Sequence, residues 1–282
     1  MTDKTLGVIG AGIMGSGIAQ TAAAGGFDVV MVDVSDAAVQ RGLSGIDGRL
    51  DRMVKKGTLD AAAKSAAMAR IRPSTDYADL AGCGLVIEAA TENYEIKVKI
   101  LKQLDAVINE TAFVASNTSS ISITHLAAAL KRPERFSGMH FFNPVPIMSL
   151  VELIRGLQTS DETHAAFDAA ARQFGKTPIS VKNSPGFAVN RLLVPMLNEA
   201  FFVLAEGLAT PEEIDEGMKL GCSHPIGPLA LADLIGLDTL LAVIEVLHAD
   251  FGDPKYRPAP LLREYVGAGY LGRKSGRGVY QY

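Results

Sequence analysis

The stretch that decides the fold is Leu6-Gly7-Val8-Ile9-Gly10-Ala11-Gly12-Ile13-Met14-Gly15, near the start of the chain. Its first half is a short apolar run, which is typical of a buried parallel strand. The residues from about Met14 to Ala24 then have the pattern of a helix, which Gly25 and Gly26 end. A strand, a glycine-rich turn and a helix in this order predict the first unit of a doubly wound parallel sheet.

Further apolar runs alternate with helical patterns over the next stretch of the chain. We expect strands at residues 27–33, 85–90, 113–116 and 136–141, and helices at residues 37–55, 95–107 and 122–130. Ser35 is the expected cap of the first of these helices. Because ligands bind at the carboxyl ends of parallel strands, the loops that follow these strands are the candidates for a site.

The pattern changes near Asn183-Ser184-Pro185-Gly186, and strand signals almost disappear after it. A long apolar helix is expected at residues 187–208, with a kink at Pro195. Thr210-Pro211-Glu212-Glu213 has the cap, proline and glutamate of a helix start, and further helices fit residues 228–249 and 260–267. We therefore expect an α/β domain at residues 1–184 and an all-helical domain at residues 185–282.

The composition narrows the class of protein. The chain has 282 residues, 48% of them hydrophobic, and a net charge of -4, so it lacks the basic excess of a nucleic-acid-binding protein. A local basic patch for an anionic small molecule stays open. Its two cysteines, Cys83 and Cys222, suffice for neither a disulfide framework nor a zinc site, and no metal is expected. With no signal peptide and no uncharged apolar stretch of membrane length, we expect a cytoplasmic protein that does not enter membranes.

Gly10, Gly12 and Gly15 have the spacing of a dinucleotide-binding loop of Rossmann type. The first glycine makes the tight turn, the second lets the backbone approach a pyrophosphate, and the third lets the helix pack on the strand. The helix N-terminus adds unpaired N–H groups and a positive dipole end. Asp33 ends the second strand, where its carboxylate would accept bonds from ribose hydroxyls and repel a 2′-phosphate, which favours NAD over NADP. The alternative is a glycine turn without a ligand.

Three further features carry chemistry. Ser116-Asn117-Thr118-Ser119-Ser120 is a dense polar loop directly after a strand, although a turn with one helix-capping serine would also have such residues. His140 lies at a strand end before two aromatic residues and an Asn-Pro turn, and a purely structural histidine is the alternative. Glu152 is flanked by aliphatic residues, so a buried carboxylate there needs a partner, and His140 is twelve residues away. A solvated strand position is the other interpretation of Glu152.

Together these residues fit the oxidation of an alcohol by NAD, which removes a hydride from carbon and a proton from oxygen. A histidine can take the proton, and a carboxylate on its other nitrogen would set the tautomer and stabilise the imidazolium. Ser119 and Asn190 carry hydroxyl and amide groups that can hold the reacting oxygen.

These motifs resemble the 3-hydroxyacyl-CoA dehydrogenase family, and most of all the bacterial stand-alone 3-hydroxybutyryl-CoA dehydrogenases. The resemblance covers essentially the whole chain. It rests on the glycine loop, Ser116-Asn117-Thr118-Ser119-Ser120, His140-Phe141-Phe142-Asn143-Pro144, the stretch from Asn183 to Arg191, and the tail from Lys274 to Tyr280. It implies interconversion of acetoacetyl-CoA and (S)-3-hydroxybutyryl-CoA with NAD(H), and a homodimer formed through the helical domain, which also closes the substrate cleft.

The resemblance also implies roles for individual residues. His140 is the general base and Glu152 its partner, while Ser119 and Asn190 contact the 3-oxygen and thioester region of the substrate. The cofactor side is lined by the loop from Gly10 to Gly15 (Ala11, Gly12, Ile13 and Met14 between them), with Asp33, Glu92, Lys97, Ser119, Asn143 and Lys274. Arg49 and Lys56 fall where family members contact the CoA phosphates, although a solvated charged helix face explains these two residues as well.

Three alternatives stay open. The first is a dehydrogenase of longer 3-hydroxyacyl-CoA thioesters. The second is a sugar-acid dehydrogenase of similar architecture, such as an L-gulonate dehydrogenase, which would not need Arg49 and Lys56. The third is a non-catalytic NAD-binding structural protein, like the lens crystallins recruited from this family. Retention of Ser119, His140, Glu152 and Asn190 together argues against the third.

Overall fold

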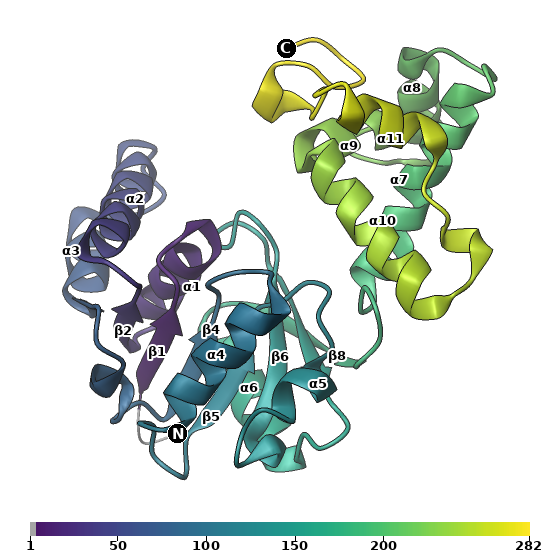
Figure 1. The fold of residues 1–282 in the computed structure, drawn as a ribbon. Helices are drawn as coiled ribbons and strands as arrows, with labels where there is room; N and C mark the ends of the chain where they lie inside the picture. Colours follow the sequence, from purple (N-terminus) through teal and green to yellow (C-terminus); the bar gives the residue numbers. More distant parts are fainter. Residues whose placement is uncertain (1–3) are drawn as a thin grey trace. The chain divides into compact units, whose positions relative to one another are not determined.

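The computed structural model describes residues 4–282 (Figure 1). The chain divides into two compact units, Met1–Ser184 and Pro185–Tyr282.

The first unit is built on one eight-stranded sheet with the strand order β3-β2-β1-β4-β5-β6-β7-β8. Its neighbouring strands are parallel except for β6 and β7, which are antiparallel. The expected doubly wound, mainly parallel sheet is therefore confirmed. The strands are β1 (Thr5–Ile9), β2 (Asp28–Val32), β3 (Ile71–Ser74), β4 (Leu85–Glu88), β5 (Phe113–Ser116), β6 (Phe136–Phe141), β7 (Leu150–Arg155) and β8 (Thr177–Lys182).

Helices cover both faces of this sheet, with α4 in front of it and α6 behind it in Figure 1. Residues of α1, α2 and α6 pack with alternate sheet residues such as Leu6 and Val8 into one large apolar core. Gly7, between these two residues, points to the opposite face of the sheet, where a Cβ on it would meet Leu80 and Val86. The helices are α1 (Ile13–Ala24), α2 (Asp36–Lys55), α3 (Ala61–Ala69), α4 (Tyr94–Asp105), α5 (Ile123–Ala127) and α6 (Asp161–Gln173), with short 3₁₀ turns at Tyr77–Leu80 and Pro133–Arg135.

Local signals placed most helix starts correctly. The side chain of Ser35 accepts a hydrogen bond from the backbone N–H of Ala38, so it caps α2 as expected. Ser122 caps α5 in the same way. The two edge strands β3 and β8 were not expected. Each contains a proline and is largely exposed, because an edge strand needs neither a full ladder of N–H donors nor an apolar run.

The second unit is all-helical in its described elements, as expected. Pro195 lies inside α7, and Thr210 and Glu213 form the expected capping box at the start of α8. The expectation of one helix over residues 228–249 is wrong. Gly236 has a φ of 104°, a value that ends a helix, and it separates α9 from α10. The helices are α7 (Val189–Ala205), α8 (Pro211–Cys222), α9 (Pro228–Ile235), α10 (Leu237–Phe251) and α11 (Pro260–Gly267), with 3₁₀ turns at Pro254–Tyr256 and Arg273–Ser275.

Two buried carboxylates hold the last residues of the chain onto the second unit. Asp233 accepts hydrogen bonds from the backbone N–H groups of Val279 and Tyr280 and from the hydroxyl of Tyr282. Asp215 accepts from the Tyr280 hydroxyl and from the first backbone N–H groups of α9. Over residues 4–282, the structure contains no helix that is both long and apolar enough to cross a membrane.

Candidate active site

The glycine turn lies at the carboxyl end of β1, between the strand and α1. Gly10 has a φ of 103°, and a Cβ on it would lie 2.7 Å from the carbonyl oxygen of Ala89. A Cβ on Gly15 would lie 1.8 Å from the carbonyl oxygen of Gly10, so only glycine lets α1 approach the strand this closely. A Cβ on Gly12, in contrast, would meet nothing within 4 Å. Gly10 and Gly15 are therefore needed because neighbouring backbone leaves no room for a Cβ, whereas Gly12 faces open space.

The open space at Gly12 fits a bound pyrophosphate. Gly12 is the N-cap of α1 and supplies no side chain to the unpaired N–H groups of the first turn. Ala11 is buried and Met14 half-buried, while Ile13 is 74% exposed at the helix start. An anion placed over this turn would meet backbone donors and the positive end of the helix dipole. The residues present thus fit a dinucleotide.

Asp33 follows β2 and points at the glycine turn. One of its carboxylate oxygens accepts a hydrogen bond from the Ala11 N–H at 2.6 Å, and the other accepts one from the Val34 N–H at 2.7 Å. A carboxylate oxygen has more than one acceptor position, so both oxygens can also accept bonds from ribose hydroxyls. The carboxylate is therefore held beside the turn that would carry the pyrophosphate.

His140 and Glu152 face each other across the antiparallel pair β6 and β7. They are directly opposite in the register of the two strands, which puts their side chains on the same face. The distance from His140 Nδ1 to Glu152 Oε2 is 2.8 Å, and the side chains are 7% and 0% exposed. The His140 ring also packs against Phe142, with ring centroids 4.6 Å apart. The expected partner of the buried carboxylate is thus the expected histidine.

The polar loop after β5 is organised by one oxygen of Glu92. Glu92 Oε1 accepts hydrogen bonds from the hydroxyl of Thr118 and from both the backbone N–H and the hydroxyl of Ser119 and of Ser120. These five bonds gather the backbone and the hydroxyl groups of the loop around a single acceptor. Asn117 ties the same loop to β6, because its side-chain oxygen accepts from the Phe141 N–H at 2.9 Å. Ser119 is therefore held on a fixed loop beside the end of the His140 strand.

The structure departs from expectation at Lys97. Its side chain is 1% exposed, and its ammonium donates to Glu88 Oε2 at 2.6 Å and to the Ser116 hydroxyl at 3.2 Å. A lysine expected on the cofactor side is thus turned into the protein. Glu88, the last residue of β4, did not enter the sequence prediction, although a carboxylate in the apolar run at residues 85–90 was a visible signal. Burial raises the pKa of the Tyr77 hydroxyl, and the charges of Glu88 and Asp33 raise it further.

The candidate residues for the CoA phosphates lie on α2 and at its end. Arg49 donates to the Gln20 side chain at 2.7 Å and to the Ser16 hydroxyl at 3.1 Å, both on α1. Burial, followed by the charge of Arg52, lowers the pKa of Arg49. Lys56 is the exposed C-cap of α2. Arg49 therefore packs on the helix that begins at the glycine turn, while Lys56 faces solvent.

The remaining predicted residues are divided between the units. Asn143 is exposed in the turn that follows β6. Asn190 lies in the first turn of α7, and Lys274 lies in the 3₁₀ turn Arg273–Ser275, where its ammonium pairs with Asp238 at 2.5 Å. Asn190 and Lys274 belong to the second unit, and their roles in the site stay predictions.

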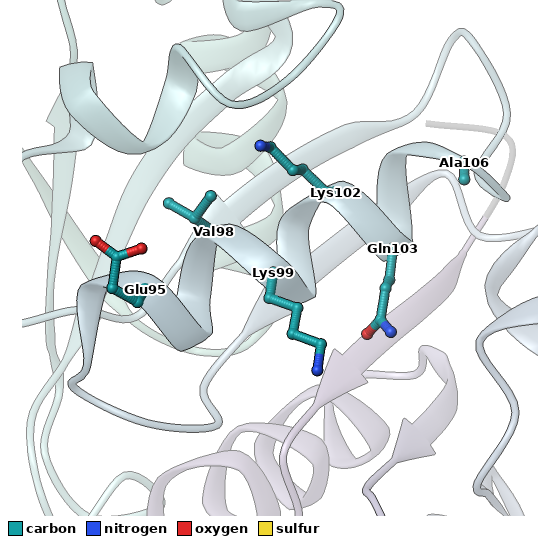
Figure 2. Close-up of a pocket in the computed structure, with 6 residues that line it drawn as sticks. All are labelled: Glu95, Val98, Lys99, Lys102, Gln103 and Ala106. Atoms are coloured by element: carbon teal, nitrogen blue, oxygen red, sulfur yellow. The ribbon is translucent and has the colours of Figure 1, made fainter.

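A separate surface hollow of about 590 Å³ runs along one face of α4 (Figure 2). Its lining side chains recur every three to four residues, as expected for a single helix face. None of the predicted site residues lines it. The lining residues are Glu95, Val98, Lys99, Lys102, Gln103 and Ala106.

Comparison with known proteins agrees with this geometry. Residues 5–184 match the family model described as 3-hydroxyacyl-CoA dehydrogenase, NAD binding domain, and residues 186–282 match the C-terminal domain of the same family. A probable 3-hydroxybutyryl-CoA dehydrogenase of Deinococcus radiodurans is 55% identical over 98% of this chain and 99% of its own length. A 3-hydroxyadipyl-CoA dehydrogenase of Escherichia coli is 42% identical over 99% of this chain and 59% of its own length.

A solved structure agrees over the whole chain. The crystal structure of the (S)-3-hydroxybutyryl-CoA dehydrogenase of Ralstonia eutropha has a TM-score of 0.97 and 68% sequence identity, with 99% of each chain covered. The two family models cover residues 5–184 and 186–282, and the Deinococcus radiodurans relative is 55% identical over 98% of this chain. These matches show the family. The chain therefore belongs to the 3-hydroxyacyl-CoA dehydrogenase family and is an NAD-dependent oxidoreductase of that family.

Proposed function

We propose that this enzyme interconverts (S)-3-hydroxybutyryl-CoA and acetoacetyl-CoA, with His140 as the general base and Glu152 as its charged partner. The observation that carries the mechanism is the buried His140–Glu152 pair, 2.8 Å apart at the end of β6. The four-carbon substrate is supported by the relatives, because several at 48–55% identity are named 3-hydroxybutyryl-CoA dehydrogenase.

We propose that the first unit holds the cofactor. The Gly10–Gly15 turn and the N-terminus of α1 bind the pyrophosphate, and Asp33 accepts bonds from the adenosine ribose. The chemistry that NAD supplies when bound is hydride transfer at the nicotinamide carbon. Glu92, Ser119, Asn143 and Lys274 are the further residues assigned to the cofactor side. For Glu92, the support is its hold on the Ser119 loop.

His140 moves the proton of the reacting hydroxyl. With its Nδ1–H bonded to Glu152, the neutral ring carries its basic lone pair on Nε2, which accepts the hydroxyl proton during oxidation. The imidazolium then formed is stabilised by the Glu152 carboxylate, which has no exposed surface and is little screened by water. Ser119 and Asn190 hold the 3-oxygen in place. In the reduction direction, the same ring returns the proton.

Arg49 and Lys56 are the proposed contacts of the CoA phosphates. They are seven residues apart, about 10 Å along the helix direction, and Lys56 is the more exposed of the two. Lys56→Ala should raise the KM for acetoacetyl-CoA several-fold at low salt but leave the KM for acetoacetyl-pantetheine, which lacks the nucleotide, unchanged. Lys102→Ala, an exposed lysine on α4, is the matched control. Equal effects on both thioesters would remove Lys56 from the CoA site.

The experiment that tests the activity is a panel of substrates with both cofactors, followed by the absorbance of NADH. Rapid oxidation of NADH with acetoacetyl-CoA, slower oxidation with longer 3-ketoacyl-CoA thioesters, and little turnover with NADPH are expected. A preference for longer or carboxylated chains would favour an activity like the one that the Escherichia coli relative is named for. Turnover of L-gulonate with no inhibition by CoA would contradict the proposal, and NADH binding without any turnover would favour a non-catalytic protein.

We propose that the second unit closes the substrate cleft and forms a homodimer. It exposes several large apolar side chains that a monomer would leave in water. Sedimentation analysis should give twice the mass of the chain. A monomer at assay concentrations would contradict the dimer. The exposed residues are Leu192, Leu208, Leu220 and Leu234.

A cytoplasmic location is also proposed. Cys222 is an exposed free thiol, which a reducing compartment preserves. Fractionation of the source cells with an antibody to the protein should place it in the cytoplasmic fraction. Recovery from an oxidising compartment would contradict this location.

A further inference from the structure

Glu88, Lys97 and Ser116 form a cluster in the interior of the first unit, beneath the carboxyl ends of β4 and β5. The side chains of Glu88 and Lys97 are 0% and 1% exposed. Glu88 Oε2 accepts from the Lys97 ammonium at 2.6 Å and from the Ser116 hydroxyl at 2.7 Å. The other carboxylate oxygen accepts from the Ala90 N–H at 2.8 Å. Replacing a buried ion pair by well-packed apolar residues is often neutral or stabilising, so a contribution to stability does not by itself account for this pair.

The same glutamate is bonded to two loops of the candidate site. Its side chain holds Ala90, and the Ala89–Ala90 backbone lies directly against Gly10, at the dinucleotide turn. Its backbone carbonyl accepts from the Asn117 N–H at 2.7 Å. Asn117 in turn accepts from the Phe141 N–H, next to His140. Glu88 is thus connected to the turn expected to carry the pyrophosphate and to the strand end that carries the proposed base.

We propose that Glu88 and Lys97 are a positioning pair, and that Lys97 supports cofactor binding through Glu88 rather than by contact with the cofactor. The nearly complete burial of Lys97 supports an indirect role, because its ammonium has almost no surface left for a ligand. Without Lys97, the buried carboxylate has no counter-charge, so it must draw in water or shift. Ala90 and Asn117 would move with it. The inference rests on the family's use of NAD, but not on the identity of the acyl substrate.

A double variant separates the indirect role from a direct one. Lys97→Met removes the ammonium but leaves the carboxylate buried and unpaired. E88Q/K97M removes both charges, and the glutamine can still bond to both neighbours, because its oxygen can accept from the Ala90 N–H while its amide N–H donates to the Ser116 hydroxyl. If Lys97 acts through Glu88, the double variant recovers NADH binding. If Lys97 touches the cofactor, the double variant stays as weak as the single one.

The matched control is Lys99→Met. Lys99 is on the same helix, two residues away, but lies exposed on the face shown in Figure 2. It tests whether the loss of any α4 lysine charge affects NADH binding.

The measurement is the dissociation constant of NADH from the change in its fluorescence, with the thermal midpoint of each variant recorded alongside. We expect Lys97→Met to weaken NADH binding by about tenfold or more, because small shifts at a binding loop are costly. E88Q/K97M should bind within about threefold of the parent protein, and Lys99→Met should bind like the parent. If Lys97→Met does not fold, the double variant alone decides, because direct contact predicts weak binding there too.

Two results would overturn the proposal. One is NADH binding by E88Q/K97M that is as weak as that of Lys97→Met. The other is a fall in thermal midpoint with NADH binding unchanged in every variant, which would make the pair structural only. Because NADH binding needs no acyl substrate, a protein that binds NADH but does not reduce acetoacetyl-CoA would contradict the proposed function and leave this test intact.

Discussion

Glu152→Gln tests the charge in the proposed mechanism while keeping the shape of the site. The glutamine oxygen can still accept the bond from His140 Nδ1, so the ring keeps its tautomer and orientation. Only the counter-charge for the imidazolium is lost. In the proposed mechanism the imidazolium forms as the ring takes up the hydroxyl proton, so the loss falls on the transition state rather than on substrate binding.

The magnitude follows from the distance and the burial of the pair. Two opposite charges roughly 4 Å apart attract by about 4 kcal/mol at an effective dielectric of about 20. The hydrogen bond from the imidazolium to the glutamine oxygen keeps about 1 kcal/mol of this stabilisation. The net loss of about 3 kcal/mol corresponds to a fall in kcat of roughly two orders of magnitude.

The assay is the initial rate of NADH formation at saturating (S)-3-hydroxybutyryl-CoA and NAD. The dissociation constant of NADH and the thermal midpoint should stay close to those of the parent enzyme. Glu110→Gln is the control, since the Glu110 side chain is 93% exposed and far more screened. A Glu152→Gln enzyme with unchanged kcat, or one that loses kcat only in proportion to its folded fraction, would refute this reasoning.

Four further predictions concern the base and the cofactor loop. His140→Ala should lower kcat by roughly a hundredfold or more with NADH binding intact, and an unchanged kcat would remove the residue from the mechanism. Asp33→Ala should weaken NAD binding and narrow the preference for NAD over NADP in steady-state assays; unchanged selectivity would show that another residue reads the ribose. Gly12→Ala should keep the thermal midpoint, because the new methyl meets open space, but weaken NADH binding, whereas parent-like binding would argue against a pyrophosphate there. Gly15→Ala should lower the thermal midpoint by several degrees, because its methyl would overlap the Gly10 carbonyl oxygen; an unchanged midpoint would contradict that packing.

Features that depend on neighbouring residues in the chain were predictable from the sequence. The glycine spacing, the apolar runs of the inner strands and the caps at Ser35 and Thr210 act over a few residues, and the structure contains them as expected. The partner of Glu152 was predictable for a different reason. A carboxylate between aliphatic residues cannot be buried alone, and one titratable group lay a short turn away.

Features that depend on residues far apart in the chain, or on which strands stay exposed at the sheet edges, were decided only by the tertiary structure. The break at Gly236 goes with its positive φ, and the edge strands β3 and β8 lack an apolar pattern because most of their side chains are exposed. His140 lies directly opposite Glu152 because β7 pairs with β6 in the antiparallel direction, in a sheet whose other pairs are parallel.

The glycine turn was visible in the sequence as ten consecutive residues, because strand, turn and helix are local. The residues that support this turn were not visible in the same way. Glu88 reaches the turn only because β4 lies beside β1, and Lys97 reaches Glu88 only because α4 packs over the strand that it follows. A lysine is usually exposed because of its charge, but Lys97 is buried. Its ammonium and the Glu88 carboxylate therefore pair with each other in the interior.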